Sequence, residues 1–111
     1  MGRHESDILR GTLDLLILKT LALQPLHGWG ISQKIQQLSA DALRIGQGSL
    51  YPALQRLEQE GWIDSDWRPT ELNRPAKHYF LTASGRRALE RETRDWRRYV
   101  GIVDGILEAR S

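Results

Sequence analysis

The stretch from Ile8 to Leu23 constrains the fold of this chain more than any other feature. It reads as a helix whose apolar residues cover nearly the whole circumference: Ile8, Leu9, Leu13, Leu15, Leu16, Ile17, Leu18, Leu21 and Leu23. A helix that is apolar all round is buried on more than one side. The core of a 111-residue chain is thin. We therefore expect one side of this helix to face the core and the other side to face something else.

Composition indicates the compartment of the protein and the kinds of site that it can have. The chain has no cysteine, which excludes disulfides and thiolate metal sites and fits a reducing cytoplasm. It has no signal pattern and no apolar run near the ~20 residues of a membrane span, so we expect a cytoplasmic protein. The net charge is only +2, but residues 42–57 and 72–89 contain no acid. This distribution predicts a local basic face that could attract phosphate.

Periodicity and helix breakers predict the remaining elements. Helices are expected over 31–38, 49–60 and 83–109, strands over 62–67 and 77–81, and a loop over 68–76, while residues 43–45 could form a very short strand. Three helices followed by a two-stranded hairpin form the winged helix-turn-helix plan. The predicted fold class is mainly α with a small β-hairpin, to which a long C-terminal helix is added.

The long C-terminal helix carries a heptad-like seam that predicts pairing with a second copy. Its members recur at spacings of four and three: Leu89, Thr93, Trp96, Val100, Val103 and Leu107. Trp96 has two interpretations that both stay open. It could anchor the dimer seam, or the two Trp96 rings of a dimer could sandwich a planar aromatic effector.

Four segments of the chain resemble the PadR-like transcriptional regulators. They are GTLDLLIL, HGWGI, GSLYPALQRLEQEGWI and HYFLTASGRRAL, and the resemblance extends from about Arg10 to Leu89. The single helix after it resembles the smaller subgroup of that family. The resemblance implies a homodimeric repressor of a bacterial operon, joined through its C-terminal helix. Some members of the family respond to phenolic or planar aromatic compounds.

These expectations define two domains. Residues 1–82 should form a winged-helix DNA-binding domain, and residues 83–111 should form a dimerisation helix, against which helix 8–23 also packs. In helix-turn-helix proteins the second helix of the pair enters the major groove, and here that helix is 49–60. Its inner face should be Leu50, Leu54 and Leu57.

The candidate DNA-binding residues lie on the two helices of this pair, on the approach to the second, and on the wing. They are Ser32, Lys34, Gln47, Ser49, Tyr51, Pro52, Gln55, Arg56, Arg74, Lys77 and His78. Hydroxyls, amides and cations of this kind bind bases or phosphates. Pro52 is expected in the first helical turn, where a missing N–H costs no hydrogen bond.

Plainer interpretations of these residues stay open. Tyr51 could be a half-buried ring that packs against helix 31–38, which would not exclude a DNA contact. The polar and basic candidates could be an ordinary solvated surface. Trp29, Trp62 and Trp67 are expected to be packing residues.

The sequence contains no motif typical of catalysis, nucleotide binding or metal binding. GQGSLY has neither the G-x-G-x-x-G form nor a Gly-Lys-Ser/Thr ending, and the three histidines are far apart without metal spacing. We therefore expect no enzyme, no cofactor and no metal. A DNA-binding regulator is the favoured function. The alternatives are a winged helix that binds proteins and a small-molecule-binding module that does not bind DNA.

Overall fold

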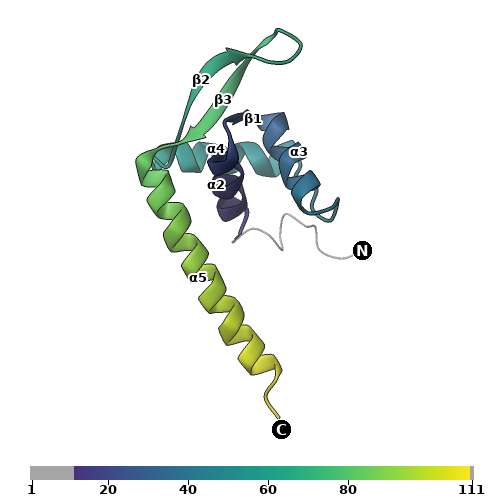
Figure 1. Ribbon diagram of the computed structural model, residues 1–111, viewed down its shortest axis with the longest axis vertical. Coiled ribbons are helices and arrows are strands. Elements are labelled where there is room, and N and C mark those ends of the chain that lie inside the picture. The colour runs from purple at the N-terminus through teal and green to yellow at the C-terminus, as the bar shows by residue number, and fades with distance from the viewer. Residues whose placement is uncertain (1–11, 111) are drawn as a thin grey trace.

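The computed structural model describes residues 12–110. Its elements are α2 (Leu13–Leu23), β1 (Leu26–His27), α3 (Gly28–Leu38), α4 (Gln47–Gln59), β2 (Ile63–Pro69), β3 (Pro75–Leu81) and α5 (Ala83–Leu107). The three shorter helices gather below the hairpin of β2 and β3, and α5 runs away from it (Figure 1). The predicted winged helix-turn-helix with a long C-terminal helix is confirmed.

The sheet has three antiparallel strands in the order β1-β3-β2, one more than predicted. The hairpin pairs Ile63 with Leu81 at its base and Pro69 with Pro75 near its loop. The added strand, β1, is only two residues long and pairs Leu26 with Tyr79. Residues 43–45, where a short strand was considered, form no strand. A strand of two residues is too short to show an alternating pattern in the sequence. Its extended conformation depends on its pairing with β3.

Helix α2 lies at the centre of the core and contacts α3, α4, α5 and β3. The fully buried large side chains come mainly from the three short helices: Ile17, Leu18, Ile31, Leu50, Leu54 and Leu57. This result confirms the predicted inner face of α4. The other side of α2 is less covered, since Leu15 and Leu16 are half-buried and Leu23 is exposed. Residues 8–11 of the predicted first helix lie outside the described residues.

The junction between α4, β2 and α5 is tightly packed. Gly61, with φ +78°, follows the end of α4 in the left-handed region, where glycine commonly ends a helix. Thr82 caps α5, because its Oγ1 accepts from the Gly85 N–H at 3.0 Å and donates to the Gly61 carbonyl at 2.6 Å. The Thr82 N–H also donates to the Trp62 carbonyl at 3.1 Å. These bonds fix the start of α5 against the end of α4.

Candidate nucleic-acid interface

Helix α4 begins at Gln47, two residues earlier than predicted, with Gly46 as its N-cap. The Gly46 carbonyl accepts from the N–H groups of Ser49 and Leu50 at 3.2 and 3.0 Å. The first turn of a helix carries a partial positive charge and N–H groups that point outward. This end of α4 therefore suits a phosphate oxygen.

The earlier start of α4 changes the role of Pro52. Pro52 now lies inside the helix, well past the first turn, so its missing N–H deprives the Gly48 carbonyl of its helical partner. The prediction that Pro52 costs no hydrogen bond was wrong. Both residues are exposed, and water or another donor can reach that carbonyl.

The outer side of α4 presents the predicted polar residues. Gln47, Gln55 and Arg56 are exposed and Ser49 is half-buried. Arg56 forms an ion pair with Asp14 of α2, with 2.8 Å between Nη2 and Oδ1. An exposed pair of this kind is worth at most about 1 kcal/mol, so a phosphate can compete for the guanidinium.

Tyr51 stands at the start of the exposed side of α4 and leans over the first turn of α3. Its side chain is 47% exposed, yet a Cβ placed on Gly28 would lie 2.6 Å from its hydroxyl oxygen. The ring thus packs against α3 and faces solvent at the same time. The two interpretations of Tyr51 left open by the sequence are compatible.

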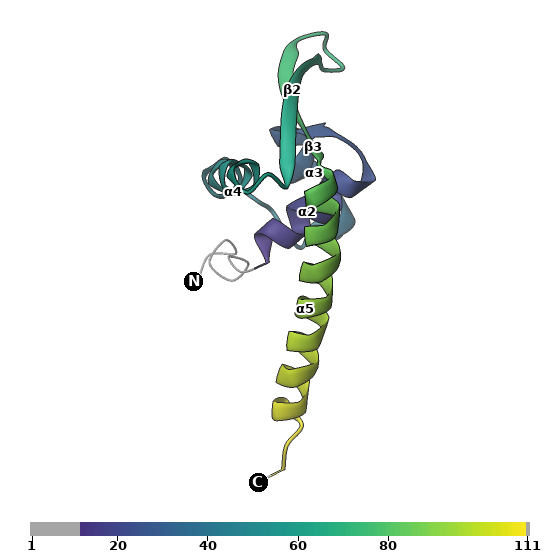
Figure 2. The ribbon, with the colours of Figure 1, turned by 90° about the vertical axis from the view of Figure 1, so that its left-hand side faces the viewer.

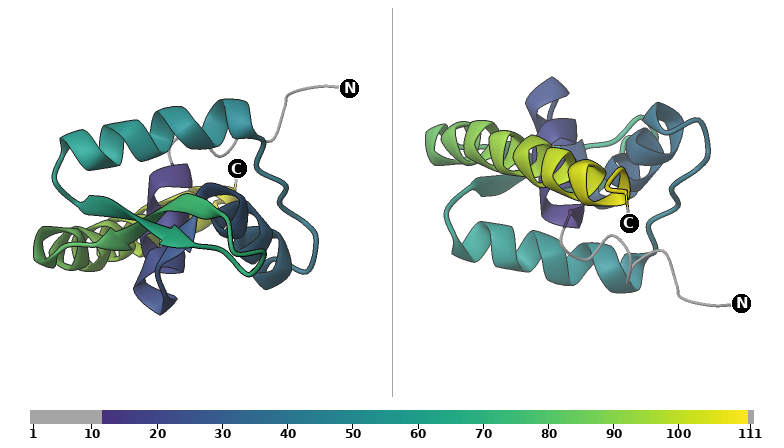
Figure 3. Two further views of the ribbon diagram at one scale, coloured as in Figure 1. Left: turned by 90° about the horizontal axis from the view of Figure 1, so that it is seen from above. Right: turned by 90° about the horizontal axis from the view of Figure 1, so that it is seen from below.

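Lys77 of β3 faces the same side of the wing as α4. Its Nζ lies 3.6 Å from the Glu58 Oε1 of α4 and 5.7 Å from the centre of the Tyr79 ring. Burial, followed by the charges of Glu58 and Tyr51, raises the pKa of Tyr79, so this ring is uncharged at neutral pH. Tyr51 and Lys77 line one cleft of about 340 Å³. Seen from above, α4 lies beside the hairpin (Figure 3).

Arg74 lies in the hairpin loop and is exposed. The loop is held by Thr70, whose N–H donates to the Arg74 carbonyl at 2.8 Å and whose carbonyl accepts from Asn73 at 2.8 Å. Asn73 has φ +59°, a left-handed conformation that asparagine tolerates in turns. The loop therefore presents Arg74 at the end of the wing.

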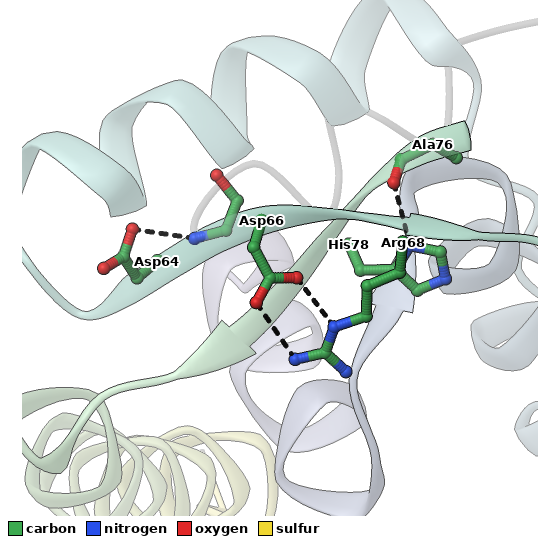
Figure 4. Close-up of polar contacts among 6 residues, drawn as sticks. Asp64, Asp66, Arg68, Ala76 and His78 are labelled. Atoms are coloured by element: carbon green, nitrogen blue, oxygen red, sulfur yellow. Dashed lines mark hydrogen bonds and ion pairs between the residues drawn. The ribbon is translucent and has the colours of Figure 1, made fainter.

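His78 lies on the opposite face of the hairpin from Lys77. Its Nδ1 donates to the Ala76 carbonyl at 3.0 Å, and its ring meets the edge of His27 at 5.2 Å between centroids. The same face carries an ion pair in which the Arg68 Nε lies 2.7 Å from the Asp66 Oδ1 (Figure 4). The structure therefore does not bring His78 together with Tyr51 and Lys77.

The two candidates on α3 are also apart from this cleft. The Ser32 hydroxyl is buried and has no hydrogen-bond partner among residues 12–110. Lys34 is half-buried and lines a different cleft of about 530 Å³ between α3 and the hairpin loop, together with Gln33, Asp41 and Glu71.

Helix α5 extends well beyond the core, on the side away from the hairpin (Figure 2). Of the predicted seam, Leu89 packs against the core and Thr93 is half-buried. Beyond them the helix leaves a stripe of large apolar side chains in solvent: Trp96, Tyr99, Ile102, Ile106 and Leu107. Val100 and Val103 lie half-buried along the same stripe.

A third cleft, of about 630 Å³, lies between α2 and α5. Leu15 and Leu16 of α2 and Trp96 of α5 line it. Lys19, Glu90, Arg94 and Arg97 place charges around it. The less covered side of α2 thus meets the start of the apolar stripe of α5.

Comparison with known proteins decides the family. The family model described as the transcriptional regulator PadR-like family matches residues 17–91. The chain belongs to the PadR-like family of transcriptional regulators. It is 30% identical over 103 residues to uncharacterized protein X of Lysinibacillus sphaericus, covering 93% of this chain and 94% of that protein. The transcriptional regulator Rv3488 of Mycobacterium tuberculosis is 35% identical over 88 residues, 79% of this chain and 78% of that protein.

A solved structure agrees with this assignment. A transcriptional regulator from Clostridium thermocellum superposes with a TM-score of 0.84 at 26% identity, covering 93% of this chain and all of that one. As a PadR-like protein, the chain is a DNA-binding transcriptional regulator and not an enzyme. In the part of the chain that the structure describes, no helix is long and apolar enough to cross a membrane.

Two residues of this PadR-like chain were misjudged from the sequence. Trp29 and Trp67 were expected to be packing residues, but they are 59% and 71% exposed. Trp62 is half-buried under the Arg91 guanidinium, 5.6 Å from its ring, and does pack. Alternation along β2 gives only the face of the strand: it places Trp67 on the side of α4 but does not show that this position lies beyond the end of the core.

Proposed function

We propose that this PadR-like regulator is a homodimeric repressor that binds an inverted-repeat operator in the cytoplasm. Helix α4 of each subunit would enter a major groove, and the hairpin would contact the neighbouring backbone. The observation that carries the proposal is the cleft shared by Tyr51 of α4 and Lys77 of the wing, beside the exposed polar side of α4. Two-fold symmetry then places the half-site centres about 34–36 Å apart, or at a multiple of that distance.

The apolar stripe of α5 supports the homodimer. Large side chains such as Ile106 and Leu107 remain in solvent along a helix of 25 residues. Burying such side chains contributes roughly 1.5–3 kcal/mol each, and a second copy of the same helix is the simplest partner with a matching stripe. In this proposal residues 83–111 dimerise, and residues 1–82 bind DNA.

The cleft between α2 and α5 supports an aromatic effector. Its volume of about 630 Å³ is within the range of small-molecule sites. Trp96 offers a flat ring at its edge, and a dimer would bring a second ring into the neighbourhood. A planar aromatic compound that binds one arrangement of the two heads better than the other would release the operator. Tryptophan fluorescence across a set of planar aromatics tests this part, and no response in the wild-type dimer would remove the effector.

The DNA-binding part is tested on duplexes that the purified protein selects from a random 30-base-pair pool. Changing Tyr51 to Ala should weaken binding to the selected duplex about 10-fold, the cost of one good polar or apolar contact. Gln59→Ala, at the far end of the same helix, is the matched control and should bind like the wild type. Equal affinities for all three proteins would remove Tyr51 from the interface.

The wing contact has a different signature. Lys77→Ala should weaken binding to every duplex and lower the slope of log affinity against log salt by about 0.9, one phosphate's worth. Lys19→Ala, which removes the same charge from α2, should leave that slope unchanged. An unaltered slope for Lys77→Ala would show that the wing lysine does not reach phosphate.

A further inference from the structure

Two exposed tryptophans flank the cleft that Tyr51 and Lys77 line. Trp67 of β2 and Trp29 of α3 both belong to its wall, and each shows more than half of its surface to solvent. Exposing large apolar rings to water costs free energy, so a cluster of them on a surface indicates a binding site. Neither ring lies in the core. Trp29 stacks on His27 with 6.4 Å between the ring centroids and lines both this cleft and the cleft of Lys34, whereas Trp67 lines this cleft.

The local structure holds Trp67 in this place. Along β2 the residues that face α4 alternate, and Ile63 is buried in the core while Ser65 donates its hydroxyl to Glu58 at 2.8 Å. Trp67 is the next residue on that face, and its register partner in β3 is Lys77. The strand thus places an aromatic ring and a cation side by side.

The charges around the cleft favour an anionic occupant. Lys77 is the cation in its lining, His27 uses its Nδ1 to accept the Gly30 N–H at 3.0 Å, and none of the described lining residues is acidic. Glu58 lies behind Lys77, at 3.6 Å from its Nζ, and holds the ammonium at the edge of the cleft. Apolar walls with one cation at the rim suit a small apolar ring that carries a phosphate.

We propose that this cleft holds one deoxyribose of the operator backbone, with the Trp67 and Trp29 rings against the sugar and Lys77 at the adjoining phosphate. The assignment rests on the proposed function, because it needs α4 in the neighbouring groove. Sugars and phosphates lie on the outside of a duplex, where the wing can meet them. A base would first have to leave the stack, which costs free energy.

Variants of Trp67 in the full chain test this assignment on the selected duplex. Trp67→Ala should bind about 10-fold more weakly, as expected when an aromatic contact to a nucleotide is removed. The salt slope should stay unchanged, because the ring carries no charge. Trp67→Phe keeps a ring and should bind within about 3-fold of the wild type, a smaller loss than the roughly 5-fold or more that follows from removing a whole aromatic contact.

A matched control comes from the other face of the same hairpin. Phe80 lies there under the Arg68 guanidinium, 5.8 Å from its ring centre, so Phe80→Leu removes an aromatic ring without touching the cleft. This variant should bind like the wild type. Circular dichroism and sedimentation of each variant show that it is a folded dimer.

Hydroxyl radicals locate the sugar directly, because they attack deoxyribose. The wild type should protect a deoxyribose beside each half-site, and Trp67→Ala should lose that protection while keeping the protection under α4. Wild-type affinity and protection in Trp67→Ala would overturn the assignment. If a thymine becomes reactive to permanganate only when the wild-type protein is bound, the cleft holds an unstacked base and not a deoxyribose, and the assignment is wrong. If the wild-type protein selects no duplex from the random pool, the proposed DNA-binding function is itself wrong, and the assignment of the cleft falls with it.

Discussion

Gly28 shows how one residue fixes the position of another. It is the first residue of α3, and the Tyr51 ring lies directly against it. A Cβ at this position would come within 2.6 Å of the hydroxyl oxygen and 3.0 Å of Cζ, so the ring would have to move. Glycine at position 28 therefore determines where the Tyr51 ring lies near the start of α4.

Changing Gly28 to Ala should displace Tyr51 and lower the affinity for the selected duplex by nearly as much as Tyr51→Ala does. It should also cost about 1–2 kcal/mol of unfolding free energy, the usual cost of overpacking. Both effects should largely vanish when Gly28→Ala is made in the Tyr51→Ala protein, since the clash has gone. Urea unfolding and binding of the single and double variants measure this. Simple addition of the two losses would show that Gly28 acts by another route.

Pro52 and Trp67 are two residues whose surroundings could not be predicted from this sequence. The pattern of Leu50, Leu54 and Leu57 gave the buried face of α4 correctly, because burial on a helix follows its period. It did not give the start of the helix, so Pro52 was assigned to the wrong turn. Exposure of Trp67 depends on how far β2 extends past the core, and no local pattern contains that length.

The start of α5 is tightly packed at Gly85. A Cβ on Gly85 would overlap the Trp62 carbonyl oxygen, a backbone atom that cannot swing aside. Gly101, farther along the same helix, has open space around it. The two glycines therefore share a helix but differ in what an added methyl group meets.

Gly85→Ala should destabilise the protein by about 3 kcal/mol, because it forces two backbone segments apart. Gly101→Ala should stabilise it by up to about 1 kcal/mol, since alanine is the better helix former. Urea unfolding at one fixed protein concentration compares them, as a dimer's stability depends on concentration. An unchanged free energy of unfolding for Gly85→Ala would mean that the junction has room for a methyl group and would contradict the prediction.

Helices and strands could be predicted from the sequence where their hydrophobic pattern was long, and less well where the element was short. The three later helices and the hairpin strands were expected within a few residues of their observed bounds, whereas the first helix was expected from Ile8 and α2 begins at Leu13. Strand β1 was missed, because two residues such as Leu26 and His27 become a strand only by pairing with β3. The sequence also could not show that Ser32 and His78 lie apart from the cleft of Tyr51, since that depends on how α3 and the wing are packed.

The proposed dimer would depend on the apolar stripe of α5. Val103 lies on that stripe, while Gly101 is exposed on the opposite face of the helix, about 200° away at 100° per residue. Val103→Arg should yield monomer in sedimentation equilibrium, because it places a charge in the apolar seam. Gly101→Arg adds the same side chain outside the seam and should leave a dimer. A persisting dimer in the Val103→Arg protein would refute the seam.

The rigid junction at Thr82 makes α5 a lever. Its cap binds the Gly61 and Trp62 backbone at the end of α4, so α4 and α5 turn together. At 1.5 Å per residue the 25 residues of α5 span about 37 Å. A tilt of about 5° at the far end would carry the head about 3 Å, close to the 3.4 Å step between base pairs. In the proposed dimer joined along this helix, a tilt of that size would therefore shift each head by about one base pair along the DNA.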